Sequence, residues 1–182
     1  MKGQREYGVI GLGRFGTAVA TTLHGLGHTV LGIDRDMARV QHVTPLITNA
    51  AQADCTDEDA LRALGFRNLD AAIVSVGPDL ESSILATVLV KELGVPYVVA
   101  KAKSALHGKI LERVGADRVV YPERLHGHRT SNVILTCDRA HRTSVAGSDY
   151  GGIRVAAGGR QVWPALGWRR LRSPSTRNQH EP

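Results

Sequence analysis

Three glycines near the N-terminus constrain the fold more than any other feature of this sequence. Gly11, Gly13 and Gly16 have the G-x-G-x-x-G spacing, and they lie between an apolar run and a segment whose apolar residues recur at helical spacing. In such a strand-to-helix turn the first glycine permits a tight turn, the second lets the backbone approach a pyrophosphate, and the third lets helix and strand pack closely. N–H groups at the start of the helix then face the phosphates. The motif predicts a nucleotide-binding turn, and glycines that only pack such a turn are the alternative.

An acidic residue ends the next apolar run. Residues 29–33 predict a second buried strand, and Asp34 follows it directly. A carboxylate at this place is suited to the ribose hydroxyls of an adenine nucleotide, and it disfavours the 2′-phosphate of NADP. Arg35 weakens the argument against NADP because its positive charge stands beside the acid. ATP, ADP and NAD(H) share the adenosine half that this site would bind, so the sequence leaves the choice among them open.

The first 123 residues alternate predicted strands with predicted helices. Beyond the first two strands, strands are expected at 45–50, 69–75, 97–100 and 118–121, and helices at 14–26, 36–43, 56–64, 80–93 and 104–114. We expect Thr56 to cap the third helix, and Ile84, Leu85, Val88 and Leu89 to form the inward stripe of the fourth. The alternation is typical of an α/β fold with a doubly wound, Rossmann-like parallel sheet. Right-handed crossovers place a ligand at the carboxyl ends of the first and fourth strands.

The pattern ends near Arg124. Residues 124–182 contain ten arginines and no lysine, both tryptophans and scattered glycines, and only 132–137 is expected to form a strand. We predict a nucleotide-binding domain at 1–123 and an irregular, basic tail at 124–182. The formal net charge of +6 belongs to this tail, because residues 1–123 carry −1 and residues 124–182 carry +7. Salt-sensitive, non-specific binding of nucleic acid by the tail is one alternative, and no specific nucleic acid is predicted.

Sequence features also bear on the compartment. No apolar run reaches 18 residues, and the N-terminal residues 1–6 are polar. We therefore expect neither a transmembrane helix nor a secretory signal. Cys55 and Cys137 lie far apart, as is typical of a reducing compartment. These features predict a cytoplasmic protein.

Candidate catalytic groups are few. A small NAD-dependent oxidoreductase is the main alternative function, but it needs a substrate region and a positioned acid or base. Lys101 and Lys103 could act as acids, whereas His107 is expected on the surface of a helix. Cys55 could be a redox thiol, although such a cysteine more often lines a turn. No pair of titratable groups converges at the strand ends, so we predict that the protein is not an enzyme.

Two places could hold a metal ion. His126, His128, Cys137 and His141 have spacings that match no common zinc site. Glu123 follows the last predicted strand of the domain, where it could coordinate a cation beside a nucleotide's phosphates or only cap a solvated turn. The residues alone favour the second role.

Seven segments carry a family resemblance. They are Val-Ile-Gly-Leu-Gly-Arg-Phe-Gly at 9–16, Leu-Gly-His-Thr-Val-Leu-Gly-Ile-Asp at 26–34, Ala-Asp-Cys-Thr-Asp at 53–57, Leu-Gly-Phe-Arg-Asn-Leu-Asp at 64–70, Lys-Glu-Leu-Gly-Val-Pro at 91–96, Lys-Ala-Lys at 101–103, and Val-Gly-Ala-Asp-Arg-Val-Val-Tyr-Pro-Glu at 114–123. In this order and spacing they resemble the N-terminal domain of regulators of potassium conductance, of the TrkA and KtrA type, and above all the Ktr branch.

The resemblance implies a function. It implies a non-catalytic cytoplasmic subunit that forms a homo-oligomer, a dimer or an octameric ring, beneath a membrane-embedded potassium-transporting subunit. NAD(H), or ATP and ADP, with a divalent cation beside the phosphates, would bias the ring between two shapes and so open or close transport.

The resemblance also implies site residues. Asp34 would hold the ribose, Lys101 would lie near the phosphates, and Arg14 would reach a phosphate, in the Ktr branch across a subunit interface. Glu123 would take the cation. The residues implied for the nucleotide are Gly11, Leu12, Gly13, Arg14, Phe15, Gly16, Asp34, Arg35, Asp54, Cys55, Thr56, Ser75, Val76, Gly77 and Lys101.

The resemblance stops at Arg124. The family continues with Asp-Met-Gly, an amphipathic crossover helix and a C-terminal ligand-binding lobe, whereas Arg124 is followed here by Leu-His-Gly-His-Arg-Thr. The crossover helix is a main dimer contact of the family, so its loss bears on assembly. Arginine without lysine, with many glycines, is what a frameshifted reading of a GC-rich gene gives. We interpret the tail as translated out of frame or otherwise divergent.

Overall fold

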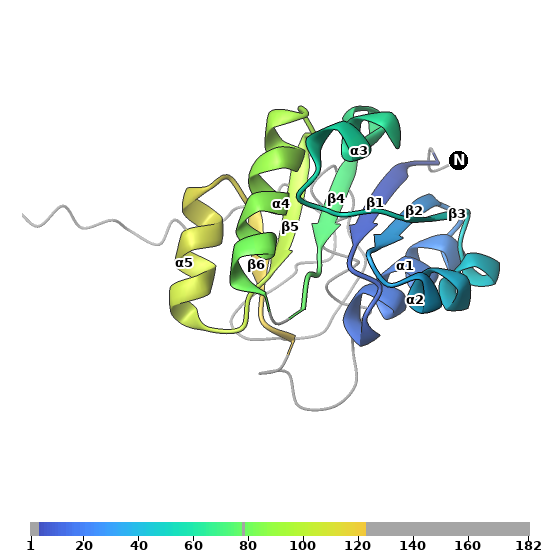
Figure 1. The fold of residues 1–182 in the computed structure, drawn as a ribbon, viewed down its shortest axis with the longest axis horizontal. Helices are drawn as coiled ribbons and strands as arrows, with labels where there is room; N and C mark the ends of the chain where they lie inside the picture. Colours follow the sequence, from blue (N-terminus) through green and yellow to red (C-terminus); the bar gives the residue numbers. More distant parts are fainter. Residues whose placement is uncertain (1–3, 78, 123–182) are drawn as a thin grey trace, which may run out of the picture. The chain divides into compact units, whose positions relative to one another are not determined.

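The computed structural model describes residues 4–77 and 79–122, and in this part of the chain strands alternate with helices (Figure 1). The strands are β1 (Glu6–Ile10), β2 (Thr29–Asp34), β3 (Asn49–Gln52), β4 (Ala71–Val74), β5 (Tyr97–Lys101) and β6 (Arg118–Val120). The α-helices are α1 (Arg14–Gly25), α2 (Met37–Val43), α3 (Glu58–Ala63), α4 (Leu80–Glu92) and α5 (Ala105–Arg113), and two short 3₁₀ helices lie at Thr44–Leu46 and Phe66–Asn68.

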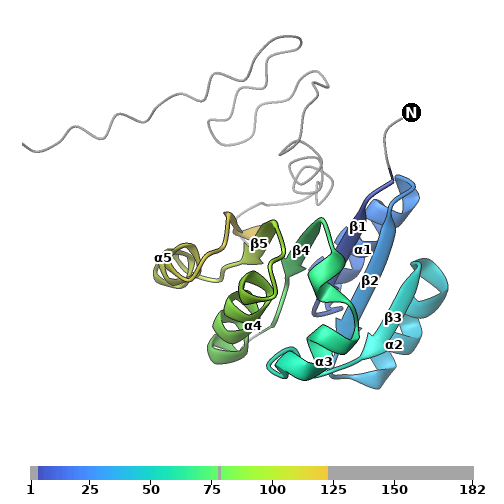
Figure 2. The same cartoon turned by 90° about the horizontal axis from the view of Figure 1, so that it is seen from above.

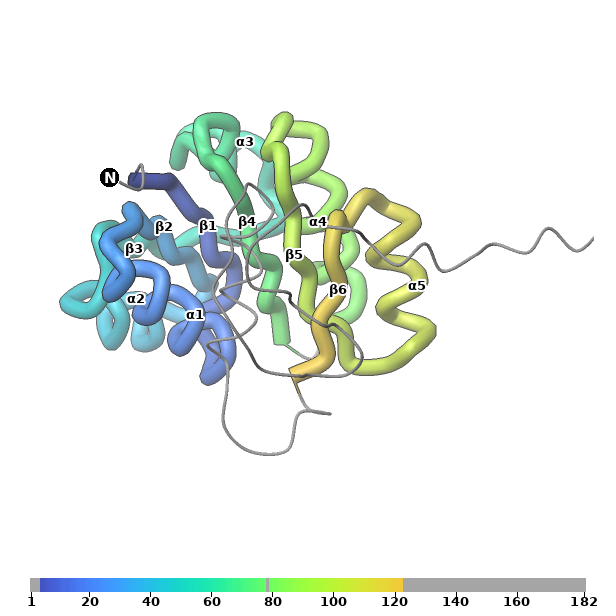
Figure 3. Tube along the Cα trace, turned by 180° about the vertical axis from the view of Figure 1, so that it is seen from behind, coloured from blue at the N-terminus to red at the C-terminus, as the bar shows by residue number. Residues whose placement is uncertain are grey.

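The strands form one parallel sheet in the order β3-β2-β1-β4-β5-β6 (Figure 3). Ile10 of β1 lies opposite Ile33 of β2 on one side and Val74 of β4 on the other. The predicted doubly wound, Rossmann-like α/β fold is confirmed. Because all strands run the same way, their carboxyl ends meet at one edge, and the strand order reverses there between β1 and β4. This reversal is where open α/β sheets bind ligands.

Helices cover both faces of the sheet, because successive strand residues point to opposite sides. On one face Val19 of α1 and Val40 of α2 pack with Val9 of β1. On the other face Leu61 of α3 and Leu111 of α5 belong to a second apolar cluster. Figures 1 and 2 show α1 and α2 next to β1–β3, and α4 and α5 next to β4 and β5. Both faces of the central strands are thereby removed from water, as in other parallel sheets.

The third strand lies further along the chain than the sequence predicted. Residues 45–50 were expected to form it, but Pro45 lies in the 3₁₀ helix and β3 is Asn49–Gln52. Proline has no N–H to donate to a sheet and is favoured at the start of a helical turn. The shift has a consequence for the site, because Ala53 follows the strand and Asp54 comes to the carboxyl edge of the sheet.

The expected cap of the third helix is wrong by one residue. Asp57 caps α3 by accepting a hydrogen bond from the Ala60 N–H at 3.1 Å. Thr56 instead donates both its N–H and its hydroxyl to Asp54, at 2.9 and 2.7 Å. Threonine is therefore committed to the turn before the helix, and the stronger acceptor one residue later takes the cap.

The inward face of α4 also differs from the prediction. Its buried residues are Ser83, Ala86, Thr87 and Val90, whereas Leu85 is 41% exposed. Ile84 and Leu89 of the expected stripe are partly buried and pack against the core, so the prediction is wrong for Leu85 and not for these two.

Several expectations fall outside the described residues. The domain boundary at 123–124, the strand at 132–137 and the interpretation of the tail all lie there. Within residues 4–77 and 79–122, no helix combines the length and apolar character needed to cross a membrane.

Candidate functional site

The three glycines of the turn have different environments. Gly11 has a φ of +90°, and a Cβ placed on it would lie 2.7 Å from the Ser75 carbonyl oxygen. A Cβ on Gly16 would lie 1.8 Å from the Gly11 carbonyl oxygen. Gly13 has a φ of −71°, and no described atom lies within 4 Å of where its Cβ would be. The fold therefore needs glycine at 11 and 16, but the described part of the chain gives no steric reason for glycine at 13.

The start of α1 lacks a side-chain cap. Gly13 is its N-cap, and the first turn contains no acidic residue. The other α-helices described are each capped by a side chain, from Asp36, Asp57, Asp79 and Ser104. The N–H groups at the start of α1 thus keep their capacity to bind an anion, supported by the helix dipole.

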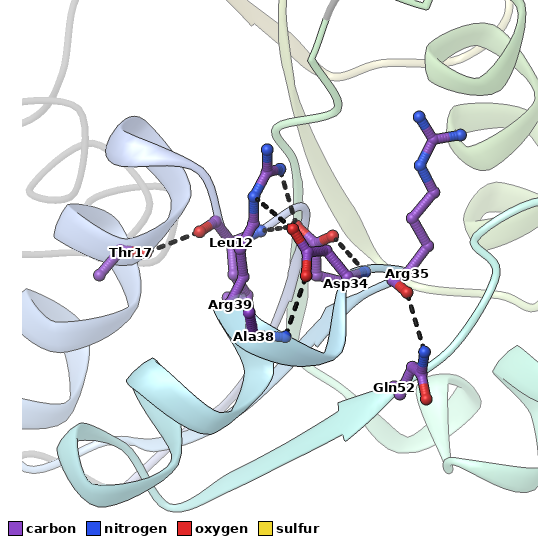
Figure 4. Close-up of polar contacts among 8 residues, drawn as sticks. Leu12, Thr17, Asp34, Arg35, Ala38, Arg39 and Gln52 are labelled. Atoms are coloured by element: carbon purple, nitrogen blue, oxygen red, sulfur yellow. Dashed lines mark hydrogen bonds and ion pairs between the residues drawn. The ribbon is translucent and has the colours of Figure 1, made fainter.

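Asp34 connects the end of β2 to the glycine turn (Figure 4). The residue is 7% exposed. Its carboxylate accepts two backbone hydrogen bonds, from the Leu12 N–H to Oδ2 at 2.7 Å and from the Asp36 N–H to Oδ1 at 2.9 Å. The Thr17 hydroxyl donates to the Leu12 carbonyl at 2.9 Å. Both backbone polar groups of Leu12 are therefore bound, which fixes the turn from its two sides. Thr17 did not emerge from the sequence, where it is one polar residue of a helix.

Two arginines lie near this acid, and the structure distinguishes them. Arg35, which the sequence singled out, is exposed and extends away from the Asp34 carboxylate (Figure 4). Arg39 instead donates to Asp34 Oδ2 at 3.4 Å, and its Nε lies 3.5 Å from Asp36 Oδ2. No sequence motif singles out Arg39, and its place in the first turn of the helix after Asp34 was the available signal. Arg14, the first residue of α1, is exposed.

The turn at the end of β3 carries Asp54, Cys55 and Thr56. The hydrogen bonds from Thr56 lower the pKa of the Asp54 carboxyl, and the charge of Arg35 lowers it further. Burial raises the pKa of the Cys55 thiol to about 11, and the charge of Asp54 also raises it. The thiol is thus protonated at neutral pH and a poor nucleophile, so the turn-lining role of Cys55 is favoured over a redox role.

Residues after β4 and β5 reach the same edge. The Ser75 N–H donates to the Ile10 carbonyl at 2.7 Å, which joins the end of β4 to the glycine turn. Val76 and Gly77 follow it and are partly buried. Lys101 ends β5, two strands from β1 and so roughly 10 Å away at the usual strand spacing. The edge thus collects the predicted residues from β1 to β5.

Some predicted residues are not part of this arrangement. Glu123, and the set His126, His128, Cys137 and His141, lie outside the described residues. Within the part of the chain that the structure describes, no group of three or more His, Cys, Asp or Glu side chains could hold a metal ion.

The surface location expected for His107 is wrong. The side chain is 4% exposed, and its Nε2 has no hydrogen-bond partner among the described residues. The Lys103 N–H points to its Nδ1 at 3.4 Å. Burial lowers the pKa of this imidazole, and the charge of Lys103 lowers it further. His107 lies on the same side of α5 as the buried Leu111, so it is part of the helix's packed face.

Comparisons with known proteins agree with this geometry. The TrkA-N domain model matches residues 7–122. Ktr system potassium uptake protein A of Bacillus subtilis (strain 168) is 41% identical over 120 residues, which are 66% of this chain and 54% of that protein. Ktr system potassium uptake protein C of the same organism is 39% identical over 133 residues, 73% of this chain and 60% of that protein. The chain therefore spans little more than half the length of these relatives.

Solved structures share the fold. The TrkA-N domain of the inner membrane protein YbaL from Escherichia coli has a TM-score of 0.60 at 15% identity, covering 78% of this chain and all of that one. The GsuK channel bound to NAD has a TM-score of 0.56 at 17% identity, covering 65% of this chain and 22% of that one. GsuK bound to ADP has a TM-score of 0.59 at 16% identity, and the match covers 87% of this chain and 48% of that one. At these identities the likeness concerns the fold alone.

Proposed function

This chain belongs to the TrkA-N domain family, and we propose that it regulates a potassium uptake system by binding an adenine nucleotide or NAD(H) at the glycine turn. The potassium part of the proposal is supported by relatives that are named potassium uptake proteins and are about 40% identical. We propose a binding role and not a catalytic one, in a cytoplasmic protein that works beside a membrane-embedded potassium-transporting subunit. The test is to express this chain in cells that lack Ktr system potassium uptake protein A. Restored potassium uptake would support this part of the proposal, and unchanged uptake would contradict it.

The observation that carries the nucleotide part is the open space at Gly13. Gly11 and Gly16 have steric reasons within the protein, but Gly13 has an ordinary φ and no described neighbour. A glycine without a steric role, at the uncapped start of a helix, suits the close approach of a phosphate to the backbone. The packing-only alternative for the glycines accounts for two of the three.

The adenosine half would extend from this turn along the carboxyl edge. Asp34 would accept the ribose hydroxyls, and the turn of Asp54 to Thr56 would flank the adenine. Lys101 would lie on the phosphate side. GsuK structures with NAD and with ADP support either kind of nucleotide. A divalent cation held by Glu123 belongs to the proposal as well, and so does a phosphate contact of the exposed Arg14, within one subunit or across an interface.

Regulation would follow from differential affinity. A ligand shifts an equilibrium between two assembly shapes only if it binds one shape more tightly. A γ-phosphate that reaches Arg14 of a neighbouring subunit in one shape would supply that difference. Comparing ATP and ADP affinities in the wild type and in Arg14→Ala tests the step, and an unchanged ratio would contradict it.

Assembly as a dimer or an octameric ring is also proposed. Leu80 and Leu85 of α4 and Leu106 of α5 are 48%, 41% and 70% exposed, on two neighbouring helices (Figure 1). Exposed large apolar side chains on adjacent elements are a common feature of subunit interfaces. Sedimentation of the wild type and of Leu106→Glu measures the oligomeric state directly. A monomeric wild type would contradict assembly.

The nucleotide part is tested by calorimetric titration of the whole chain with ATP, ADP, NAD and NADH. We expect binding by the wild type and a loss of about tenfold or more in Gly13→Ala, because the added methyl group occupies the space of a phosphate contact worth at least about 1.4 kcal/mol. Gly25→Ala is a matched control, since it adds the same methyl group to open space at the other end of α1. Absence of nucleotide binding in the wild type, or equal affinity in the wild type and Gly13→Ala, would contradict the proposal.

The oxidoreductase alternative has no observation in its favour. The Cys55 thiol is protonated at neutral pH, and His107 is buried in the packed face of α5. Neither of these two groups is therefore suited to act as an acid or a base at the strand ends. Nicotinamide-dependent turnover of a simple substrate would reopen this alternative.

A further inference from the structure

Arg39 makes a contact that no motif predicts, at the end of the proposed nucleotide site formed by Asp34 and Asp36, which we call the ribose end. It belongs to the first turn of α2, and its guanidinium lies 3.4 Å from Asp34 Oδ2 and 3.5 Å from Asp36 Oδ2 (Figure 4). The Arg39 side chain is 53% exposed, whereas that of Asp34 is 5% exposed. Long contacts of an exposed arginine contribute little to stability, so this side chain leaves its partners at low cost.

The acceptor capacity of Asp34 gives this contact a role. Each carboxylate oxygen accepts two hydrogen bonds. One place on Oδ2 is taken by the Leu12 N–H and one on Oδ1 by the Asp36 N–H, and Arg39 takes the second place on Oδ2. A ribose that donates two hydroxyls to this carboxylate therefore displaces Arg39. The displaced guanidinium remains beside the 2′ position, because its helix holds it there.

The local charge points the same way. Asp34 and Asp36 place two carboxylates at this end, and Arg39 is the cation that contacts both. The charge of Arg35 acts on other carboxyl groups. It adds to the lowering of the Asp54 pKa, which is chiefly due to hydrogen bonds from Thr56. It adds likewise to the lowering of the Asp79 pKa, which is chiefly due to a hydrogen bond from Ser82. Without Arg39, a 2′-phosphate would meet the two carboxylates with no adjacent counter-charge.

We propose that Arg39 is a specificity-determining residue, which reduces the discrimination against a ribose 2′-phosphate that Asp34 creates. The inference rests on the proposed nucleotide site and extends it to the ligand's 2′ substituent. A guanidinium forms paired hydrogen bonds with phosphate, so Arg39 can bind a 2′-phosphate once it has left Asp34. Nucleotides with a 2′-hydroxyl would lose no affinity when Arg39 is removed, because for them it is only a competitor for Oδ2.

The test compares two probes that differ at the 2′ position, 5′-AMP and adenosine 2′,5′-bisphosphate. Calorimetric or competition titration of the whole chain gives the ratio of their dissociation constants. We expect the wild type to bind both, 5′-AMP more tightly, and Arg39→Ala to widen the ratio by about tenfold at low salt through weaker binding of the bisphosphate. Arg39→Lys should give a ratio between those of the wild type and Arg39→Ala, because it keeps the charge but loses the paired hydrogen bonds.

A control and a second variant make the test decisive. Arg62→Ala removes an arginine that is 49% exposed and paired with Glu58 on its own helix, so it matches the change in net charge without touching Asp34. Arg39→Gln removes the charge with a side chain of similar length, in case Arg39→Ala unfolds. The inference is overturned if the wild type binds 5′-AMP but not the bisphosphate, if both Arg39 variants keep the wild-type ratio, or if Arg62→Ala widens it equally. Failure of the wild type to bind 5′-AMP would overturn the proposed nucleotide site itself.

Discussion

The two ends of the candidate site use their hydrogen-bonding groups in opposite ways. At the phosphate end, among the residues that the structure describes, no side chain caps the N-terminus of α1 and no neighbour lies within 4 Å of a Cβ placed on Gly13. At the ribose end, the Asp34 carboxylate already accepts from Leu12, Asp36 and Arg39. One end offers free donors, and the other offers an acceptor that is fixed in place and partly occupied. The phosphate end is therefore suited to bind the phosphates of any nucleotide. The ribose end is suited to select among nucleotides that differ in their ribose.

The largest expected effect separates the glycines that the fold needs from the one it does not. Gly16→Ala should lower the free energy of unfolding by about 3 kcal/mol or more, because its Cβ would lie 1.8 Å from a backbone oxygen. Gly13→Ala should change it by less than about 1 kcal/mol. Urea denaturation without nucleotide measures both, and a strongly destabilised Gly13→Ala would remove the contrast between these glycines.

The next effect concerns the ribose end. Asp34→Asn should lower the free energy of unfolding by about 2 kcal/mol, because one acceptor oxygen becomes an amide NH2 donor that faces a backbone N–H. An Arg39→Ala variant should cost at most about 1 kcal/mol, since its contact is exposed. Equal losses in the two variants would mean that Arg39, and not the backbone, holds Asp34.

A smaller effect tests the support of the turn itself. Thr17→Val keeps the shape of the side chain and removes its hydrogen bond to the Leu12 carbonyl, which should cost about 1 kcal/mol of stability. Thr21→Val removes an equivalent hydroxyl one turn further along α1 and serves as control. We expect weaker nucleotide binding in Thr17→Val alone, and identical binding in both variants would show that Leu12 needs no such support.

The smallest effect lies away from both ends. Burial and Lys103 lower the pKa of His107 in the folded state, so the unfolded chain takes up the proton first as the pH falls. Stability contributed by neutral His107 is complete above about pH 6.5 and is lost below it, by at most about 1 kcal/mol down to pH 5.5. His107→Leu should flatten this slope in urea denaturation at several pH values, whereas a variant of the exposed His42 should not. An unchanged slope in His107→Leu would contradict the buried, neutral state.

Particular residues show what the sequence could predict. The doubly wound parallel sheet and the TrkA-N resemblance were predicted correctly, because strands alternate regularly with helices and seven family-like segments follow in order. Apolar periodicity predicted the inward face of α4 only in part: Ile84 packs against the core, but Leu85 is exposed and the polar Ser83 is buried. Arg39 was missed because an arginine on a short helix has many possible partners, and only the three-dimensional arrangement selects Asp34.

If Gly13 is kept open for a nucleotide, alanine at this position should weaken nucleotide binding without weakening the fold. The most direct measurement is the free energy of unfolding of the wild type, Gly13→Ala and Gly25→Ala, each without ADP and at an ADP concentration of about one hundred times the wild-type dissociation constant. We predict similar stability for all three without ADP, and a gain of about 2.7 kcal/mol with ADP in the wild type and Gly25→Ala. Gly13→Ala should gain about half of this or less, because its affinity is at least about tenfold lower. An equal gain in all three would contradict the claim.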